Sequence, residues 1–253
     1  MRVCYMGWRD DDEGGDLRSG GGSCLLDYTR SCYSRVCGDV LRCGENCEPR
    51  ARLVGVVMTR PLICLDPGHP SRQGDVGCSS GDFREFEFTW DVAMLLNARL
   101  IKDGRYDTRF SRNRIDEAVW KTRGVRAKGA DCVVSIHADA AANTSAHGAR
   151  IYCYCGNRPN LSQSLARSIL PVFPQPLNRR MIETDPKPRP DYVGYPRVCN
   201  VLDLFDAPVK VLIECGFVTN DIDFAALQSA TVCIGIAGAI HFGLDQVFFP
   251  GSR

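Results

Sequence analysis

Three apolar segments of this 253-residue chain end in side chains that can bind a metal ion or transfer a proton. "LICLDPGH" ends at His69, "CVVSIH" at His137 and "VKVLIE" at Glu214. In open α/β sheets, sites form just beyond the carboxyl ends of the strands, so neighbouring strands would bring these side chains together. A single histidine at a strand end is more often structural than a ligand. Two of the chain's four histidines in such positions, together with a glutamate, favour a metal site.

A further ligand candidate, Glu85, lies in the segment "FREFEFTWDVAMLL". A catalytic zinc usually has three protein ligands and one open position, so another ligand is needed. In a helix that begins here, the apolar face contains Phe88, Val92 and Leu96. Glu85 lies on this face, whereas Glu87 lies about 200° away and faces solvent. An acidic residue in the first helical turn can also simply stabilise the helix dipole. The inward position of Glu85 favours the role of a ligand.

From residue 58 onward, short apolar runs alternate with helical patterns, which is typical of an α/β domain with a sheet covered on both faces. We expect strands at 61–66, 106–111, 132–137, 149–154 and 209–214, and helices at 85–102, 114–129, 161–171, 222–229 and 231–247. The stretch 174–197 contains six prolines and charges of both signs. It is predicted to be a long surface loop.

Residues 1–57 differ in composition from the remainder of the chain. Stretches such as "RDDDEGGDLRSGGGS" are too polar and glycine-rich to build a core. We expect either a disordered or marginally ordered extension or a wrongly assigned start with Met58 as the initiator. The catalytic domain is then predicted to span residues 58–253.

Six of the 14 cysteines lie in the extension, without the CxxC pair that a zinc knuckle would show. The cysteines within apolar segments are expected to be small buried hydrophobes (Cys64, Cys132, Cys153, Cys215 and Cys233).

A shortened chain that begins at Met58 is therefore expected to fold and to keep its activity. The reason is that residues 1–57 cannot bury enough apolar surface to offset the entropy of ordering them. Solubility, thermal unfolding and catalytic activity of the shortened and full chains check this. An insoluble or inactive shortened chain beside an active full chain would refute the domain boundary.

Composition excludes several classes of function. A hydrophobic content of 44% and a charged content of 24% fit a globular protein. The net charge of +1 implies no strong attraction to nucleic acid or to an anionic membrane surface. No apolar run reaches the ~18 residues needed to span a bilayer, and no secretory signal peptide is visible.

The motifs together resemble zinc-dependent N-acetylmuramoyl-L-alanine amidases, which cleave peptidoglycan. "DPGHPSRQGDVG", a glutamate followed by an apolar helix, "SIHADA" and "VLIECGFVTN" occur in the family's order over residues 60–247. The resemblance implies a Zn²⁺ ion held by His69, Glu85 and His137, with Glu214 as the catalytic acid/base. It implies hydrolysis of the amide bond between N-acetylmuramic acid and L-alanine by a zinc-activated water. The fold it implies is a twisted, mostly parallel mixed sheet flanked by helices on both faces.

The resemblance also implies peptidoglycan as the substrate, a monomeric enzyme, and a location in the periplasm or cell envelope. Arg112 and Arg114 fall near the family's "TR" after its second strand. Pro70 and Cys215 depart from the pattern, because the family commonly has a second glycine at the first position and another small or polar residue at the second.

Three rival functions remain open at the level of the sequence. One is another zinc-dependent amidase or peptidase on a similar scaffold. Another is a degenerate, non-catalytic wall-binding regulator, which the presence of all four site residues disfavours. A cysteine hydrolase using Cys215 is weaker, because neither His147 nor His241 is clearly placed beside it.

Overall fold

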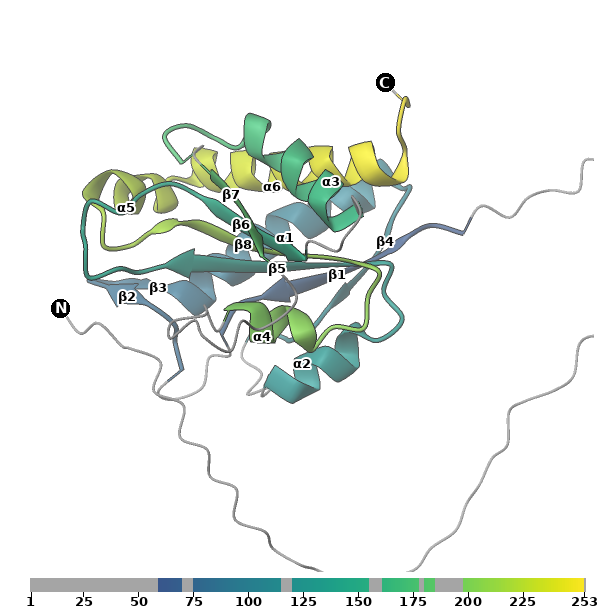
Figure 1. Ribbon diagram of the computed structural model, residues 1–253, viewed down its shortest axis with the longest axis horizontal. Coiled ribbons are helices and arrows are strands. Elements are labelled where there is room, and N and C mark those ends of the chain that lie inside the picture. Colours follow the sequence, from purple (N-terminus) through teal and green to yellow (C-terminus); the bar gives the residue numbers. More distant parts are fainter. Residues whose placement is uncertain are drawn as a thin grey trace, which may run out of the picture. The chain divides into compact units, whose positions relative to one another are not determined.

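A computed structural model describes residues 59–69, 75–114, 120–154, 161–177, 180–184 and 198–252. Its centre is a six-stranded sheet with the strand order β4-β1-β5-β8-β6-β7 (Figure 1). The strands are β1 (Leu62–Pro67), β4 (Asp107–Phe110), β5 (Cys132–Asp139), β6 (Arg150–Tyr154), β7 (Arg180–Thr184) and β8 (Val209–Phe217). β4, β1, β5 and β8 run parallel, whereas β6 is antiparallel to β8 and parallel to β7. The predicted mostly parallel mixed sheet is confirmed.

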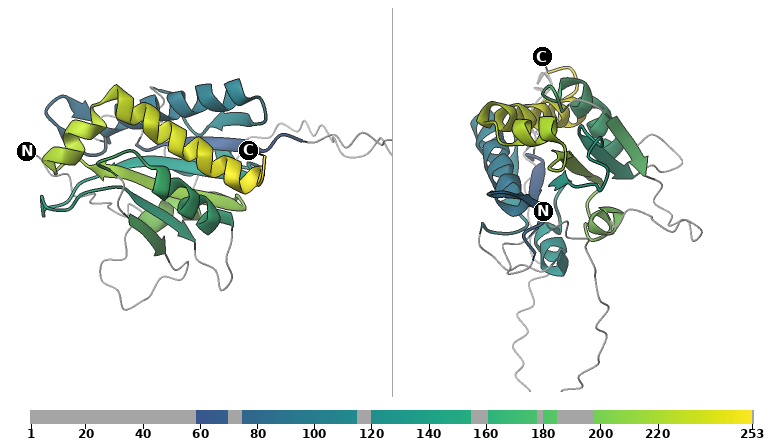
Figure 2. Two further views of the ribbon diagram at one scale, coloured as in Figure 1. Left: turned by 90° about the horizontal axis from the view of Figure 1, so that it is seen from above. Right: turned by 90° about the vertical axis from the view of Figure 1, so that its left-hand side faces the viewer.

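Helices cover both faces of the sheet, as predicted (Figure 1). One face carries α1 (Glu85–Asp103), α3 (Leu161–Ile169), α5 (Asp221–Leu227) and α6 (Ala230–Phe248). The other face carries α2 (Trp120–Ala127) and α4 (Val198–Asp203). A short 3-10 helix, η1 (Leu170–Val172), extends α3, and β2 (Ser79–Ser80) pairs with β3 (Phe83–Arg84) just before α1. Figure 2 shows α6 lying between α1 and α3.

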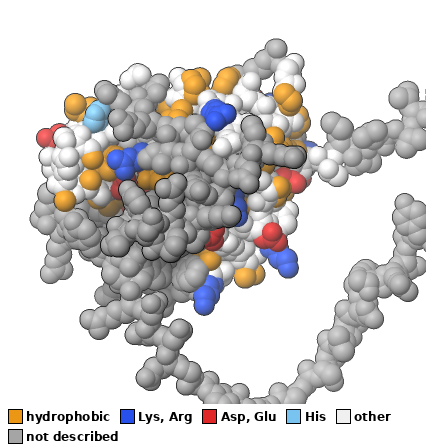
Figure 3. Space-filling view, in the orientation of Figure 1, with side chains coloured by type: hydrophobic (Ala, Val, Ile, Leu, Met, Phe, Trp, Pro, Cys, Tyr) orange, Lys and Arg blue, Asp and Glu red, His pale blue; other side chains and the backbone are white. Residues whose placement is uncertain are grey.

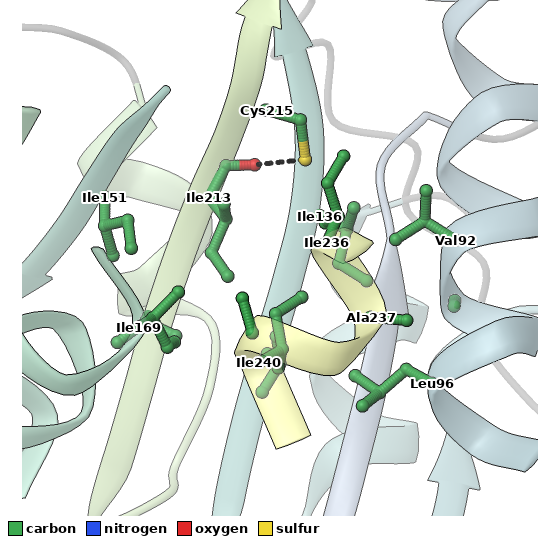
Figure 4. Packing of buried hydrophobic residues seen from close by; sticks show 14 of the residues in the cluster. Val92, Leu96, Ile136, Ile151, Ile169, Ile213, Cys215, Ile236, Ala237 and Ile240 are labelled. Atoms are coloured by element: carbon green, nitrogen blue, oxygen red, sulfur yellow. Dashed lines mark hydrogen bonds between the residues drawn. The ribbon is translucent and has the colours of Figure 1, made fainter. Parts of the chain in front are cut away.

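The main hydrophobic core lies between the sheet and the layer of α1, α3 and α6 (Figure 4). Strand alternation sends Ile63 and Leu65 of β1 into this core and Cys64 into a smaller cluster on the opposite face. In α1, Val92 and Leu96 are fully buried against the sheet, so the predicted apolar face of this helix is confirmed.

Local capping signals fix the ends of the helices that border the site. α1 ends at Gly104, which adopts a φ of 78° and donates its N–H to the carbonyl of Leu100. Glycine adopts this left-handed conformation at low cost, so the helix stops here. α5 begins after Asn220, whose side chain accepts hydrogen bonds from the N–H groups of Ile222 and Asp223.

Helix α6 is long and apolar enough to cross a membrane by length and composition alone, with a mean hydropathy of 1.4 over its most apolar window. The core helix of a globular domain meets the same criterion. Ile236, Ile240 and Leu244 of α6 are completely buried against the rest of the domain. The burial of one face shows that α6 is part of the core.

Charged side chains of the described residues show no separation by sign on the face in Figure 3, where basic and acidic groups are interspersed with hydrophobic ones. This distribution agrees with the net charge of +1. The described residues that are visible in this view form no extended basic surface of the kind that binds nucleic acid.

The structure corrects three details of the sequence-based prediction. Residues 180–184, expected to lie in a surface loop, form the edge strand β7. Helix α4 was not predicted at all. β5 and β8 do not end at His137 and Glu214 but continue to Asp139 and Phe217, because pairing resumes beyond an irregularity in register. Residues 1–57 lie outside the described residues, so the prediction for that segment stays a prediction.

Candidate active site

The structure brings together His69, Glu85 and His137, whose metal-binding atoms all lie within 4.8 Å of one another. His69 lies two residues beyond β1, Glu85 is the first residue of α1, and His137 lies in β5. Oε1 of Glu85 is 3.3 Å from Nε2 of His69 and 3.1 Å from Nδ1 of His137. All three residues are buried, with at most 7% of their surface exposed. Two nitrogens and one carboxylate oxygen, gathered from distant segments, form a donor set that could hold a metal ion.

The backbone around Glu85 fixes its carboxylate on both sides. Oε2 accepts a hydrogen bond from the N–H of Cys78 at 2.8 Å, and Oε1 accepts one from the N–H of Ala138 at 3.0 Å. Gly77, with a φ of 70°, lies so close that an added Cβ would overlap Oε2 of Glu85. A Cβ on Gly68 would lie 2.5 Å from Nδ1 of His137. Both glycines are therefore required by the tight packing around these three side chains.

His69 adopts an unusual backbone conformation that is held by a hydrogen bond. Its φ of 52° lies in the left-handed region, where non-glycine residues are uncommon. Nδ1 of His69 lies 2.8 Å from Oδ1 of Asp75, which leaves Nε2 facing Glu85. A carboxylate on the far nitrogen of a metal-ligating histidine fixes the orientation of the ring. The sequence reasoning missed Asp75, although the motif "GHPSRQGDVG" contains it.

The electrostatics of the cluster follow from burial and from mutual attraction. Burial favours the neutral carboxyl, but His69 and His137 hold the pKa of Glu85 well below its usual range. Burial also opposes charge on His69, but Glu85 and Asp75 raise the pKa of this histidine to about 10. Burial lowers the pKa of His137 despite the neighbouring Glu85. The cluster thus offers an ionised carboxylate and one neutral imidazole, and a bound cation would displace the proton of His69.

Glu214 lies on β8 directly beside His137 of β5 in the parallel register. It is 7% exposed, and its Oε2 is buried without a hydrogen-bond partner among the described residues, as is Nε2 of His137. Burial, with the added repulsion of Asp139 and Glu85, raises the pKa of Glu214 well above its usual range. A carboxyl group with a raised pKa is suited to accept and return a proton near neutral pH.

The family model described as N-acetylmuramoyl-L-alanine amidase matches residues 63–246, a span that contains all four of these residues. The chain belongs to this amidase family. Among curated proteins, the N-acetylmuramoyl-L-alanine amidase LytC of Bacillus subtilis (strain 168) is 29% identical over 188 residues. That match covers 72% of this chain and 34% of LytC, so the chain spans about a third of the length of that relative.

Solved amidase structures share the fold at low sequence identity. The amidase AmiC2 of Nostoc punctiforme matches with a TM-score of 0.62 at 23% identity, over 75% of this chain and 98% of that one. The CwlD amidase from Clostridioides difficile, solved in complex with the GerS lipoprotein, matches with a TM-score of 0.61 at 22% identity, over 74% and 98% of the two chains. These likenesses establish the amidase fold for this chain.

In this amidase-family chain, Arg112 links two of the segments that carry the candidate active site. Its side chain is completely buried. It donates hydrogen bonds to the carbonyls of Pro67 at 2.9 Å, Gly68 at 3.0 Å and Phe86 at 2.8 Å. One guanidinium thus joins the turn before His69 to the first turn of α1. Arg114, by contrast, is exposed.

Asp66 anchors the turn that carries His69. It is completely buried and receives two hydrogen bonds from Arg123 of α2, at 2.7 and 2.6 Å. The hydroxyls of Ser111 and Ser135 donate to its two oxygens at 2.5 Å. Burial favours the neutral acid, but Arg123 and these hydroxyls keep the pKa of Asp66 below its usual range. The network connects β1, β5 and α2 beneath the candidate active site.

Cys215 is not a nucleophile in this fold. It is completely buried, and its Sγ lies 3.9 Å from the carbonyl of Ile213 within the core (Figure 4). Burial raises the pKa of this thiol well above its usual range. Because the thiolate is the reactive form, the rival reading as a cysteine hydrolase is wrong. The prediction that the cysteines of apolar segments are buried is confirmed for Cys64, Cys132, Cys153 and Cys215, whereas Cys233 of α6 is only partly buried.

A second group of potential ligands, Asp103, His241 and Asp245, also has its atoms within 4.8 Å of one another. Here a protein cation is already present, because Arg105 donates to Asp103 at 2.6 Å and to Asp245 at 2.7 Å. We interpret this group as an ion-pair network that joins the end of α1 to α6.

Proposed function

We propose that this chain hydrolyses the amide bond between N-acetylmuramic acid and L-alanine in peptidoglycan with the help of a zinc ion. The observation that carries the proposal is the convergence of His69, Glu85 and His137, with Glu214 on the adjacent strand. Family membership supports the reaction, because the matching family is that of N-acetylmuramoyl-L-alanine amidases.

The donor set fits zinc, which is commonly held by histidine nitrogens and a carboxylate oxygen with one position left open. We propose His69, Glu85 and His137 as the ligands. The buried Nε2 of His137 and Oε2 of Glu214 support an occupied, hydrated site, because buried polar atoms normally have a partner such as water or an ion. When bound, zinc acts as a Lewis acid that lowers the pKa of water to ~7 and polarises the scissile carbonyl.

Glu214 performs the proton transfers in the proposed reaction. Its carboxylate accepts a proton from the attacking water and then delivers that proton to the leaving amine of L-alanine. Its burial and its position beside His137 favour this role. The hydrogen bonds from Cys78 and Ala138 hold Glu85 in place. These contacts favour Glu85 as a fixed ligand and leave the proton transfers to Glu214.

We propose that the chain acts in the periplasm or cell envelope, where peptidoglycan lies. We propose a monomer as its active form. The similarity to the N-acetylmuramoyl-L-alanine amidase LytC supports this location.

Product analysis tests the proposed function. The zinc-loaded protein is incubated with purified muropeptides, and the products are identified by mass spectrometry. We expect separated sugar and peptide products with a free carboxyl group on the muramic acid and a free amino group on L-alanine. Removal of zinc by a chelator should stop the reaction, and added zinc should restore it. Cleavage at another bond would contradict the proposal.

Asp75 provides a test of the proposed zinc site. Asp75→Ala is expected to weaken zinc binding on the order of 10–100-fold, because the far nitrogen of His69 loses the carboxylate that orients the ring. Competition with a coloured chelator measures the zinc affinity. Asp82→Ala, an exposed residue of the β2–β3 turn, is the matched control and should leave it unchanged. Equal zinc affinities in both variants would remove Asp75 from the site.

A further inference from the structure

A cationic side chain lies beside the proposed acid/base. Arg150 begins β6 and lies directly opposite Glu214 in the antiparallel pairing of β6 with β8. Opposite residues of an antiparallel pair project from the same face of the sheet, and neighbouring strands are about 4.8 Å apart. The guanidinium can therefore contact substrate groups that lie only a few bonds from a scissile amide bound beside Glu214.

The guanidinium of Arg150 contacts an aromatic ring and stays partly exposed. Its Cζ lies 4.5 Å from the centre of the Phe217 ring, a contact that orients the charged group. Among the described residues, Arg150 pairs with the carboxylate of Asp139, at 3.5 Å between Nη1 and Oδ2. The side chains of Arg150 and Asp139 are 33% and 26% exposed, so solvent and a ligand can reach both of them.

The ion pair of Arg150 differs from that of Arg123, which has a structural role. Arg123 makes two short hydrogen bonds to Asp66 at 2.6 and 2.7 Å, and its side chain is only 5% exposed. The long contact of Arg150 with Asp139 is a weaker, more exposed pair, which a second carboxylate can replace. The planar guanidinium presents several donors in a fork that matches a carboxylate.

The chemistry of the substrate indicates which group the guanidinium of Arg150 would bind. Around the scissile amide, the sugar side carries neutral hydroxyl and acetamido groups. The peptide side continues from L-alanine into a glutamyl residue that bears a free carboxylate or its carboxamide. A cation beside Glu214 complements the carboxylate and discriminates against the carboxamide.

We propose that Arg150, oriented by Phe217, forms an anion subsite for the carboxylate of the stem-peptide residue that follows L-alanine. This inference rests on the proposed amidase function and defines its substrate class: muramoyl peptides with a free acid at that position.

The test uses the full chain loaded with zinc and two synthetic muramoyl peptides. In both, L-alanine is followed by a glutamyl residue with an amidated distal end, and they differ only in a free α-carboxylate or an α-carboxamide. kcat/KM and KM are measured for the wild type, Arg150→Gln and Arg150→Lys. Arg99→Gln, which changes an exposed arginine of α1, is the control. Thermal unfolding verifies that each variant is folded.

We expect the wild type to prefer the carboxylate substrate by about tenfold or more in kcat/KM, because hydrogen bonds between charged groups are the stronger ones. Arg150→Gln should abolish the preference, chiefly by raising KM for the carboxylate substrate. Arg150→Lys should keep part of the preference and Arg99→Gln all of it.

Two outcomes overturn the subsite while leaving the amidase function intact: equal cleavage of both substrates by the wild type, or an undiminished preference in Arg150→Gln. The first needs no variant, so it decides the question even if Arg150→Gln does not fold. Failure of the wild type to cleave either substrate or any natural muropeptide would instead refute the proposed function and the subsite with it.

Discussion

Glu214→Gln is expected to lower the rate of muropeptide hydrolysis on the order of 10²–10⁴-fold, the usual contribution of a positioned proton-transfer group. Glutamine preserves the volume of the side chain but cannot accept the proton of the attacking water. The three proposed ligands lie on other elements and stay in place, so bound zinc should be retained. Steady-state hydrolysis and metal content are measured on the same preparation.

Glu87→Gln is the matched control for this experiment. Glu87 lies on the exposed face of α1, two residues from Glu85, so its substitution should change neither activity nor zinc content. A Glu214→Gln variant that stays active would show that another group transfers the proton. A variant that loses zinc would show that Glu214 is itself a ligand.

Asp66→Ala is expected to destabilise the protein by about 3–5 kcal/mol, the usual cost of removing one partner from a buried ion pair. Arg123 would be left buried without its carboxylate, and the hydroxyls of Ser111 and Ser135 would lose their acceptor. The large effect reflects the complete burial of Asp66. Unfolding in urea, followed by circular dichroism, measures the change in the free energy of unfolding.

Asp107→Ala is the control for Asp66→Ala. Asp107 pairs with Arg60 at 2.8 Å, but both side chains are about half exposed. Removing an exposed pair costs about 1 kcal/mol or less. If the two aspartate variants lose the same small amount of stability, the network around Asp66 does not support the site as we describe it.

The positions of the proposed ligands could be predicted because each depends on local periodicity. The spacing of Phe88, Val92 and Leu96 sets the phase of α1, and that phase turns Glu85 inward and Glu87 outward. Parallel strands with near-continuous apolar runs bring their carboxyl ends to one edge of the sheet. That rule predicts from the sequence alone that His137 lies beside Glu214.

Other features depend on tertiary contacts that the sequence does not display. The resemblance singled out Arg112 by its position in the sequence, but only the folded chain shows that it binds the carbonyls of two separate segments. β7 is a five-residue edge strand in a proline-rich stretch, where the strand signal is weak. The continuation of β5 to Asp139 depends on an irregular register with β8, which periodicity alone does not predict.

The amount of zinc bound per chain tests the central claim most directly. We measure it by elemental analysis after dialysis against zinc-containing buffer, for the wild type and for His69→Ala, His137→Ala and Glu85→Gln. We predict stoichiometric zinc in the wild type, none in either histidine variant, and weakened binding in Glu85→Gln, because two ligands hold a catalytic zinc poorly. A folded His69→Ala or His137→Ala protein with stoichiometric zinc, or a wild type with none, would contradict the proposed metal centre.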